Sequence, residues 1–153
     1  MKYNISKAIK GEVVEFQTPD KAFYDALGKE GMQELMYKFY DEIYNSDIAH
    51  FFPQDPDEFE EVKKKNTKFF IQICGGPSTY DETLKGLNLN DYMIELHKNF
   101  SIYEKSRDEW LGIFREQLIP LDLDQNIKDN FWEYLDKFSK LMVNRYIEKS
   151  SYF

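Results

Sequence analysis

Apolar residues in this chain recur three and four positions apart, and the strict alternation that is typical of β-strands is scarce. This helical spacing restricts the fold more than any other feature of the sequence. It predicts helices at about residues 30–45 and 57–74, a short one beginning near 90, one that Pro120 closes, and a last one at about 124–149. We therefore expect an all-α protein with short connections.

Glycine, proline and serine residues indicate where these helices begin and end. Gly75-Gly76-Pro77 predicts a helix end, because glycine suits a left-handed cap and proline cannot continue the helix. Thr18-Pro19-Asp20 is interpreted as an N-cap followed by proline at the first helical position. Ser101 and Ser106 each precede a glutamate by three residues, so both are candidates for a capping box.

Charge and composition narrow the class of partner. The formal net charge of −8 disfavours nucleic acid as a partner, because an acidic surface repels phosphates. The run Lys63-Lys64-Lys65 is interpreted as a solvated helix face. No apolar run is long enough for a signal peptide or a membrane span, so we expect a cytoplasmic protein without a membrane partner. Cys74 is the single cysteine, which excludes an internal disulfide.

His97 is the most informative single residue. It is one of two histidines, the other being His50. A lone histidine on an apolar helical face is usually an ordinary core or surface residue. This one follows the Gly75-Gly76-Pro77 stop and precedes Arg107-Asp108-Glu109-Trp110-Leu111. That order makes His97 a candidate axial ligand to haem iron, because neutral imidazole binds iron well and a single one leaves the sixth position open.

An ordered set of motifs between about residues 22 and 145 carries a family resemblance. The set comprises Tyr24-Asp25-Ala26-Leu27-Gly28, Phe39-Tyr40, Phe51-Phe52-Pro53, Phe69, Gly75-Gly76-Pro77, Tyr80, His97, Phe100, Ile102, Arg107, Asp108, Trp110 and Leu111. It resembles the truncated haemoglobins, and among them the second (O-type) group. The resemblance implies a two-over-two helical sandwich around one haem b. It also implies an N-terminal extension over residues 1–18 and a single globin domain over residues 19–153.

The resemblance also implies roles for individual residues. His97 would be the proximal iron ligand, and Tyr40 and Trp110 the distal donors, since each combines an apolar body with one N–H or O–H group. Asn66 stands at a polar distal position, although it could equally cap a backbone group or face water. Val62 stands at the gate position and offers no hydrogen bond. The candidate haem-binding residues are Phe52 and Tyr80, by resemblance, and Phe69, Phe70, Ile73, Met93, Phe100 and Ile102, each of which could equally be ordinary core.

The leading hypothesis is a haem globin that binds O2, NO, CO or another diatomic ligand reversibly. Donors aimed at a bound ligand slow its release, which favours NO dioxygenation, peroxide reduction or sensing over bulk oxygen transport. Any electrons would then come from a separate reductase. The alternative is a haem-free globin-like domain for protein interaction. A non-haem metal hydrolase is a distant third, because the two histidines lack a motif such as HExxH.

Overall fold

The structure, a computed structural model, describes residues 3–80, 84 and 86–146. Within these residues there are helices and no strands, so the predicted all-α class is confirmed. The elements are α1 (Lys21–Tyr44), the 3-10 helix η1 (Ala49–Phe51), α2 (Pro56–Ile73), α3 (Leu89–His97), α4 (Glu104–Leu118) and α5 (Gln125–Lys140). None of the helices in this described part is both long and apolar enough to cross a membrane.

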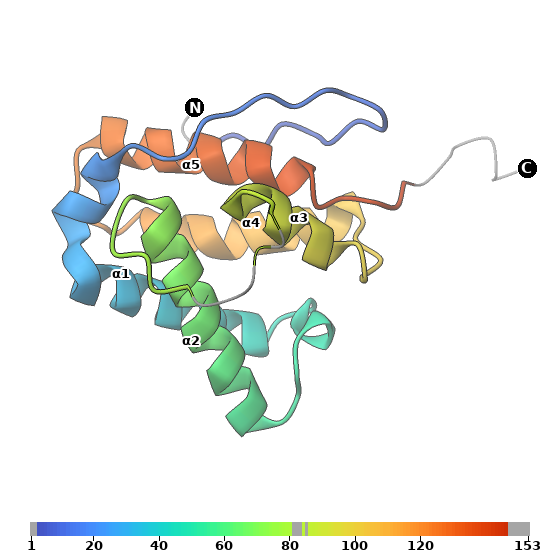
Figure 1. Cartoon of the computed structure of the whole chain (residues 1–153), viewed down its shortest axis with the longest axis horizontal. Coiled ribbons are helices and arrows are strands. Elements are labelled where there is room, and N and C mark those ends of the chain that lie inside the picture. The colour runs from blue at the N-terminus through green and yellow to red at the C-terminus, as the bar shows by residue number, and fades with distance from the viewer. Residues whose placement is uncertain (1–2, 81–83, 85, 147–153) are drawn as a thin grey trace, which may run out of the picture.

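Two helix pairs form the sandwich. α1 packs against α2, α4 packs against α5, and α1 also contacts both members of the second pair (Figure 1). Aromatic rings fill the space between the pairs. Phe39 stacks on Phe114 at 3.8 Å between centroids, and Phe23 stacks on Phe131 at 4.1 Å. Large buried aromatic side chains supply much of the hydrophobic stabilisation of such a core, so these contacts join α1 firmly to α4 and α5.

The first helix begins earlier than its apolar stripe predicts. α1 starts at Lys21, with Asp20 as its N-cap, so the interpretation of Thr18 as the cap and Pro19 as the first helical residue is wrong. Gly28 interrupts the helix with φ of +70°, a left-handed conformation that glycine adopts readily. This break changes the direction of the helix, and the continuous apolar stripe therefore begins only after it.

The predicted end of α2 is confirmed. Asp55 caps its start by accepting a hydrogen bond from the backbone N–H of Glu58 at 3.0 Å. At the other end Gly75 has φ of +91°, and the N–H of Gly76 donates to the carbonyl of Ile71 at 2.9 Å. A Cβ atom on Gly76 would lie 2.8 Å from the ring of Tyr24, so glycine permits a close approach between this turn and α1.

Two other boundary predictions are wrong. α4 has Tyr103 as its N-cap and no side-chain cap, so neither Ser101 nor Ser106 forms the expected capping box. α5 ends at Lys140 rather than near Lys149. Residues 141–146 are turn and irregular structure, and residues 147–149 lie outside the described part of the chain.

The segment before α1 runs along α5 (Figure 1). The indole N–H of Trp132 donates to the carbonyl of Asn4 at 2.7 Å, and the ring of Phe16 lies 5.9 Å from that of Tyr134. The buried guanidinium of Arg107, on α4, donates to the carbonyl of Ser6 at 2.9 Å. These contacts fasten parts of residues 3–19 to α4 and α5.

Candidate functional site

His97 is the last residue of α3 and is half-buried. Its Nδ1 atom lies 2.7 Å from the carbonyl oxygen of Met93, one turn earlier. A carbonyl oxygen only accepts, so Nδ1 carries the hydrogen, and in the neutral ring the lone pair is on Nε2. Burial lowers the pKa of His97 and the hydrogen bond to Met93 opposes this only in part, so the ring is neutral at physiological pH. The Nε2 lone pair of this imidazole can therefore bind a metal ion.

His50 provides an internal comparison. Its Nδ1 atom also lies near a backbone carbonyl, that of Asp47 at 3.0 Å, but the side chain is exposed on η1. The two histidines therefore share a local hydrogen-bond pattern and differ in burial.

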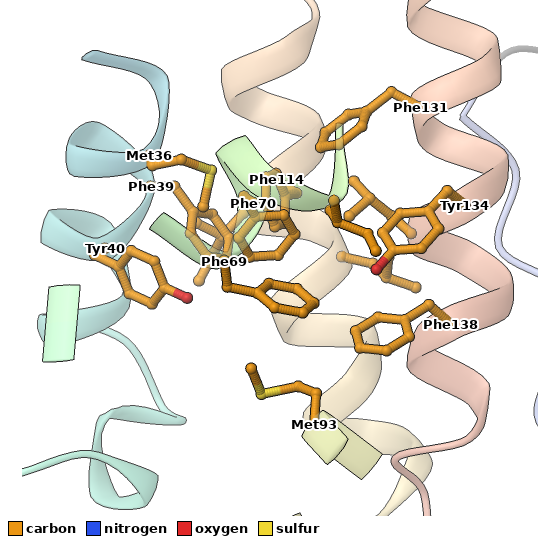
Figure 2. Packing of buried hydrophobic residues seen from close by; sticks show 14 of the residues in the cluster. Met36, Phe39, Tyr40, Phe69, Phe70, Met93, Phe114, Phe131, Tyr134 and Phe138 are labelled. Atoms are coloured by element: carbon orange, nitrogen blue, oxygen red, sulfur yellow. The ribbon is translucent and has the colours of Figure 1, made fainter. Parts of the chain in front are cut away.

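Tyr40 lies on α1 and is buried, with 3% of its surface exposed. Figure 2 shows its hydroxyl pointing inward, toward Phe69 of α2. Burial raises the pKa of the Tyr40 hydroxyl, a hydrogen-bonding contact with the side chain of Asn66 lowers it by less, and nearby Tyr80 raises it further. The hydroxyl therefore stays protonated and can donate a hydrogen bond. Asn66 and Tyr80 lie close to it from α2 and from the segment after α2.

Aromatic contacts join Tyr40 to the other predicted distal residues. The ring of Phe39 packs edge to face against Tyr40 at 5.0 Å and against Trp110 at 5.8 Å. The ring of Phe52 also lies edge to face with that of Tyr40, at 6.1 Å between centroids. Trp110, half-buried on α4, also packs on Phe114 at 4.9 Å. The fold thus brings the phenol and the indole against the same apolar ring, that of Phe39.

A second set of contacts surrounds His97. Phe100 lies 6.4 Å from the imidazole and 6.1 Å from Phe51, so it links α3 to η1. Phe100 is 42% exposed and therefore lies at an open edge. Met93 and Ile102 are buried on either side of His97 in the sequence. In Figure 2 the side chain of Met93 reaches from α3 toward the core cluster.

The remaining candidate residues of the site lie in different parts of the fold. Tyr80 is buried, contacts Phe69 at 6.0 Å and donates its backbone N–H to Oε1 of Gln72 at 3.1 Å. Phe70 packs with Phe114 at 5.5 Å and Phe131 at 6.5 Å, in the core between α2, α4 and α5. Ile73 is buried at the end of α2, and Val62 is half-buried one turn before Asn66.

Sequence reasoning missed the polar residues that support the site. Gln72 fixes the backbone at Tyr80, and Asn144 bonds to the segment that follows His97. Lys63 is also misjudged, because it is 5% exposed and pairs with Asp41 at 3.0 Å and Glu60 at 2.8 Å rather than lying on a solvated face. A polar residue gives no signal of its partner when that partner lies on another element. Within the described residues no three His, Cys, Asp or Glu side chains gather as a metal site.

A two-over-two helical sandwich with a neutral histidine on its shortest α-helix and a buried tyrosine on its first defines a truncated globin. The family model for bacterial-like globins matches residues 22–144, and the chain belongs to that family. It is 25% identical over 122 residues to the group 2 truncated hemoglobin YjbI of Bacillus subtilis, a match covering 80% of this chain and 88% of that protein.

Solved structures agree with this assignment. The phosphate-bound Hell's gate globin IV has a TM-score of 0.79 and 27% identity, and the match covers 95% of this chain and 89% of that one. The group II truncated hemoglobin of Bacillus anthracis shares the fold, with a TM-score of 0.69 at 21% identity, over 93% of this chain and 99% of that one. Membership of this family implies a haem cofactor.

Proposed function

We propose that this protein is a haem b-containing truncated haemoglobin that binds O2 and other diatomic ligands reversibly at the iron. The observation that carries the proposal is the state of His97. Its ring is neutral, its Nδ1–H is held by the Met93 carbonyl, and its Nε2 lone pair remains for iron. The chemistry of this donor, together with the aromatic ring of Phe100 beside it, fits a haem.

Haem iron supplies the open coordination position at which a diatomic ligand binds. The distal residues of this chain would control how long the ligand stays. Tyr40 keeps its hydroxyl proton because it is buried, so it donates a hydrogen bond to a polar ligand. Trp110 would add its indole N–H. Apolar neighbours such as Phe52 exclude water, and a hydrogen bond is electrostatically stronger in such surroundings.

The other predicted residues take supporting roles in this proposal. Asn66 acts through Tyr40, whose hydroxyl its amide approaches. Val62 would form an apolar gate, because it has no group that could bind the ligand. The haem-binding walls would be Phe52, Phe69, Tyr80, Met93 and Ile102, with Phe100 at the exposed edge and with Phe70 and Ile73 behind them in the core.

Two donors near the ligand favour slow release, which suits redox chemistry or sensing better than bulk oxygen transport. NO dioxygenation and peroxide reduction are the reactions we propose, with O2, NO or CO as ligands and a separate reductase in the cytoplasm as the electron source. Stopped-flow mixing of the O2-saturated ferrous protein with NO tests the first reaction. Slow formation of ferric protein and nitrate would exclude a dioxygenase.

Haem binding itself is tested by absorption spectroscopy of the full chain after addition of haem. We expect a Soret band for the wild-type protein and for the His50→Ala variant. The His97→Ala variant should lose the spectrum of a histidine-ligated haem. His50 is a matched control because its imidazole makes the same kind of backbone contact but is exposed. A wild-type chain without a Soret band would favour a haem-free interaction domain instead.

A further inference from the structure

The short helix that carries His97 is held differently from the other helices. In the described structure the most extensive helix-to-helix contacts join α1, α2, α4 and α5, and α3 makes fewer contacts with each of them. Its buried side chains, Tyr92 and Met93, anchor one face. The position of its ends therefore depends strongly on individual hydrogen bonds.

Asn144, just beyond α5, bonds to the segment that follows His97. Its Oδ1 accepts from the N–H of Ile102 at 2.9 Å, and its Nδ2 donates to the carbonyl of Phe100 at 2.8 Å. Nδ2 also lies 3.5 Å from the carbonyl of His97 itself. The backbone N–H of Asn144 donates to the carbonyl of Ile102 at 3.0 Å. Asn144 thus bonds to the segment of residues 97–102 near both of its ends.

The N-terminal end of α3 is held by a hydrogen bond from α5. The hydroxyl of Tyr134, on α5, donates to Oδ1 of Asn90 at 2.7 Å. Tyr134 is 1% exposed and packs on Phe138 at 5.2 Å, so it is a rigid support. Hydrogen bonds from α5 and from the residues just after α5 therefore hold α3 near both of its ends.

We propose that Asn144 is a positioning residue for His97. The Met93 carbonyl fixes the imidazole relative to α3, and Asn144 fixes the C-terminal end of α3 relative to the rest of the globin. Together they set the direction in which Nε2 points. Groups that orient a metal ligand in this way affect metal binding strongly even though they never touch the metal. This inference rests on the proposed function, since it requires His97 to bind iron.

The side chain of asparagine suits this position because its planar amide offers an acceptor and two donors at once. Replacement by aspartate keeps the acceptor for Ile102 and loses both donors. Replacement by alanine removes the side-chain hydrogen bonds to Ile102 and Phe100 but keeps the backbone N–H of residue 144, which donates to Ile102. Arg145→Ala is the matched control, because the exposed Arg145 side chain bonds to the adjacent carbonyl of Asn144 at 3.1 Å rather than to residues 97–102, and its backbone N–H to Ile102 is unaffected.

The test compares these variants in the full chain loaded with haem. Resonance Raman spectroscopy of the ferrous protein reports the iron–histidine stretching band, and transfer of haem to an acceptor apoprotein reports its rate of loss. For Asn144→Ala we expect a band that moves to lower frequency and broadens, and haem loss about tenfold faster. Asn144→Asp should fall between alanine and wild type. Arg145→Ala should match wild type in both measurements.

Hydrogen exchange of the haem-free chain supplies an independent readout. Residues 97–102 should lose protection in Asn144→Ala while α4 and α5 keep theirs. Faster exchange combined with an unchanged iron–histidine band and unchanged haem loss would mean a purely structural role and would overturn the proposal. If wild-type protein binds haem through His97, such a result leaves the proposed function intact. If wild-type protein takes up no haem, both proposals fail.

Discussion

The side chain of Asn66 on α2 lies close enough to the buried hydroxyl of Tyr40 on α1 to lower the pKa of that hydroxyl. Burial raises the pKa of Tyr40, and the contact with Asn66 lowers it by a smaller amount. The phenol therefore keeps its proton. An amide N–H that donates to a phenol oxygen leaves the O–H available to donate to a third group.

Substitution Tyr40→Phe should raise the rate of O2 dissociation about tenfold, because one hydrogen bond to the ligand is lost, a change equivalent to about 1.4 kcal/mol. Stopped-flow displacement of O2 by CO measures the rate. Tyr44→Phe is the control, since Tyr44 lies one turn later on α1 and donates instead to the carbonyl of Gln54 at 2.7 Å. Equal effects of the two substitutions would contradict the assignment of Tyr40.

Substitution Asn66→Leu should also speed O2 dissociation, but by only a few-fold, because Tyr40 remains and loses only its support. Combined with Tyr40→Phe, it should add almost nothing further, since Asn66 acts through the phenol. The four rates of this double-mutant cycle provide the measurement. Additive effects would show that Asn66 contacts the ligand independently.

The helices were predictable because their apolar stripes are long and one-sided, whereas some of their ends were not. The left-handed Gly28 divides α1, so its first turns fall outside the continuous stripe. At the other end of the chain, Met142 and Tyr146 keep helical spacing after α5 has stopped at Lys140. Apolar spacing reports burial, and burial continues in these irregular residues.

The site was predictable only as far as a family pattern reaches. His97, Tyr40 and Trp110 follow from that pattern, and their roles stay predictions until tested. Asn144 could not be found in this way, because it bonds to Ile102 across 42 residues. The role of Gln72 could not be predicted either, because its partner is a backbone N–H beyond the Gly75-Gly76-Pro77 turn. Such bonds depend on tertiary geometry rather than on local spacing.

Substitution Glu104→Gln should change how stability depends on pH. Burial raises the pKa of Glu104, and the positive charge of Arg107 and the N–H of Ala8 lower it by less. The folded protein therefore binds this proton more tightly than the unfolded chain, whose pKa is near 4.5. Stability from this group is present at low pH and is lost as pH rises above 4.5 through the folded pKa.

Urea denaturation of wild-type and Glu104→Gln protein between about pH 4 and pH 7 checks the sign. The other carboxylates titrate in both proteins, so their contribution cancels in the difference. We expect the free energy of unfolding of the variant, relative to wild type, to increase as pH rises. Parallel curves would mean that Glu104 has an ordinary pKa in the folded state.

Loss of the buried Arg107 side chain should lower the stability of the protein substantially. Its guanidinium donates to the Asp136 carboxylate at 2.6 Å, to Ser139 Oγ at 2.9 Å and to the carbonyl of Ser6 at 2.9 Å. Arg107→Met would fit the space but leave Asp136 as a partly buried charge without its partner. Breaking a buried pair from one side costs about 3–5 kcal/mol, which urea denaturation would measure. Arg107→Lys should lose less stability than Arg107→Met, because lysine keeps the positive charge but lacks the planar guanidinium group with its several donors.

The control for Arg107 is Arg115→Met, on the same helix. Arg115 reaches the same N-terminal segment through one long contact, 3.4 Å to the carbonyl of Tyr3. We expect it to lose less than about 1 kcal/mol, the range of a single exposed or partly exposed polar contact. Hydrogen exchange should show that residues 3–8 lose protection in Arg107→Met before α4 and α5 do. A uniform loss across all three would mean that Arg107 stabilises the core directly rather than by holding the N-terminal segment to α5.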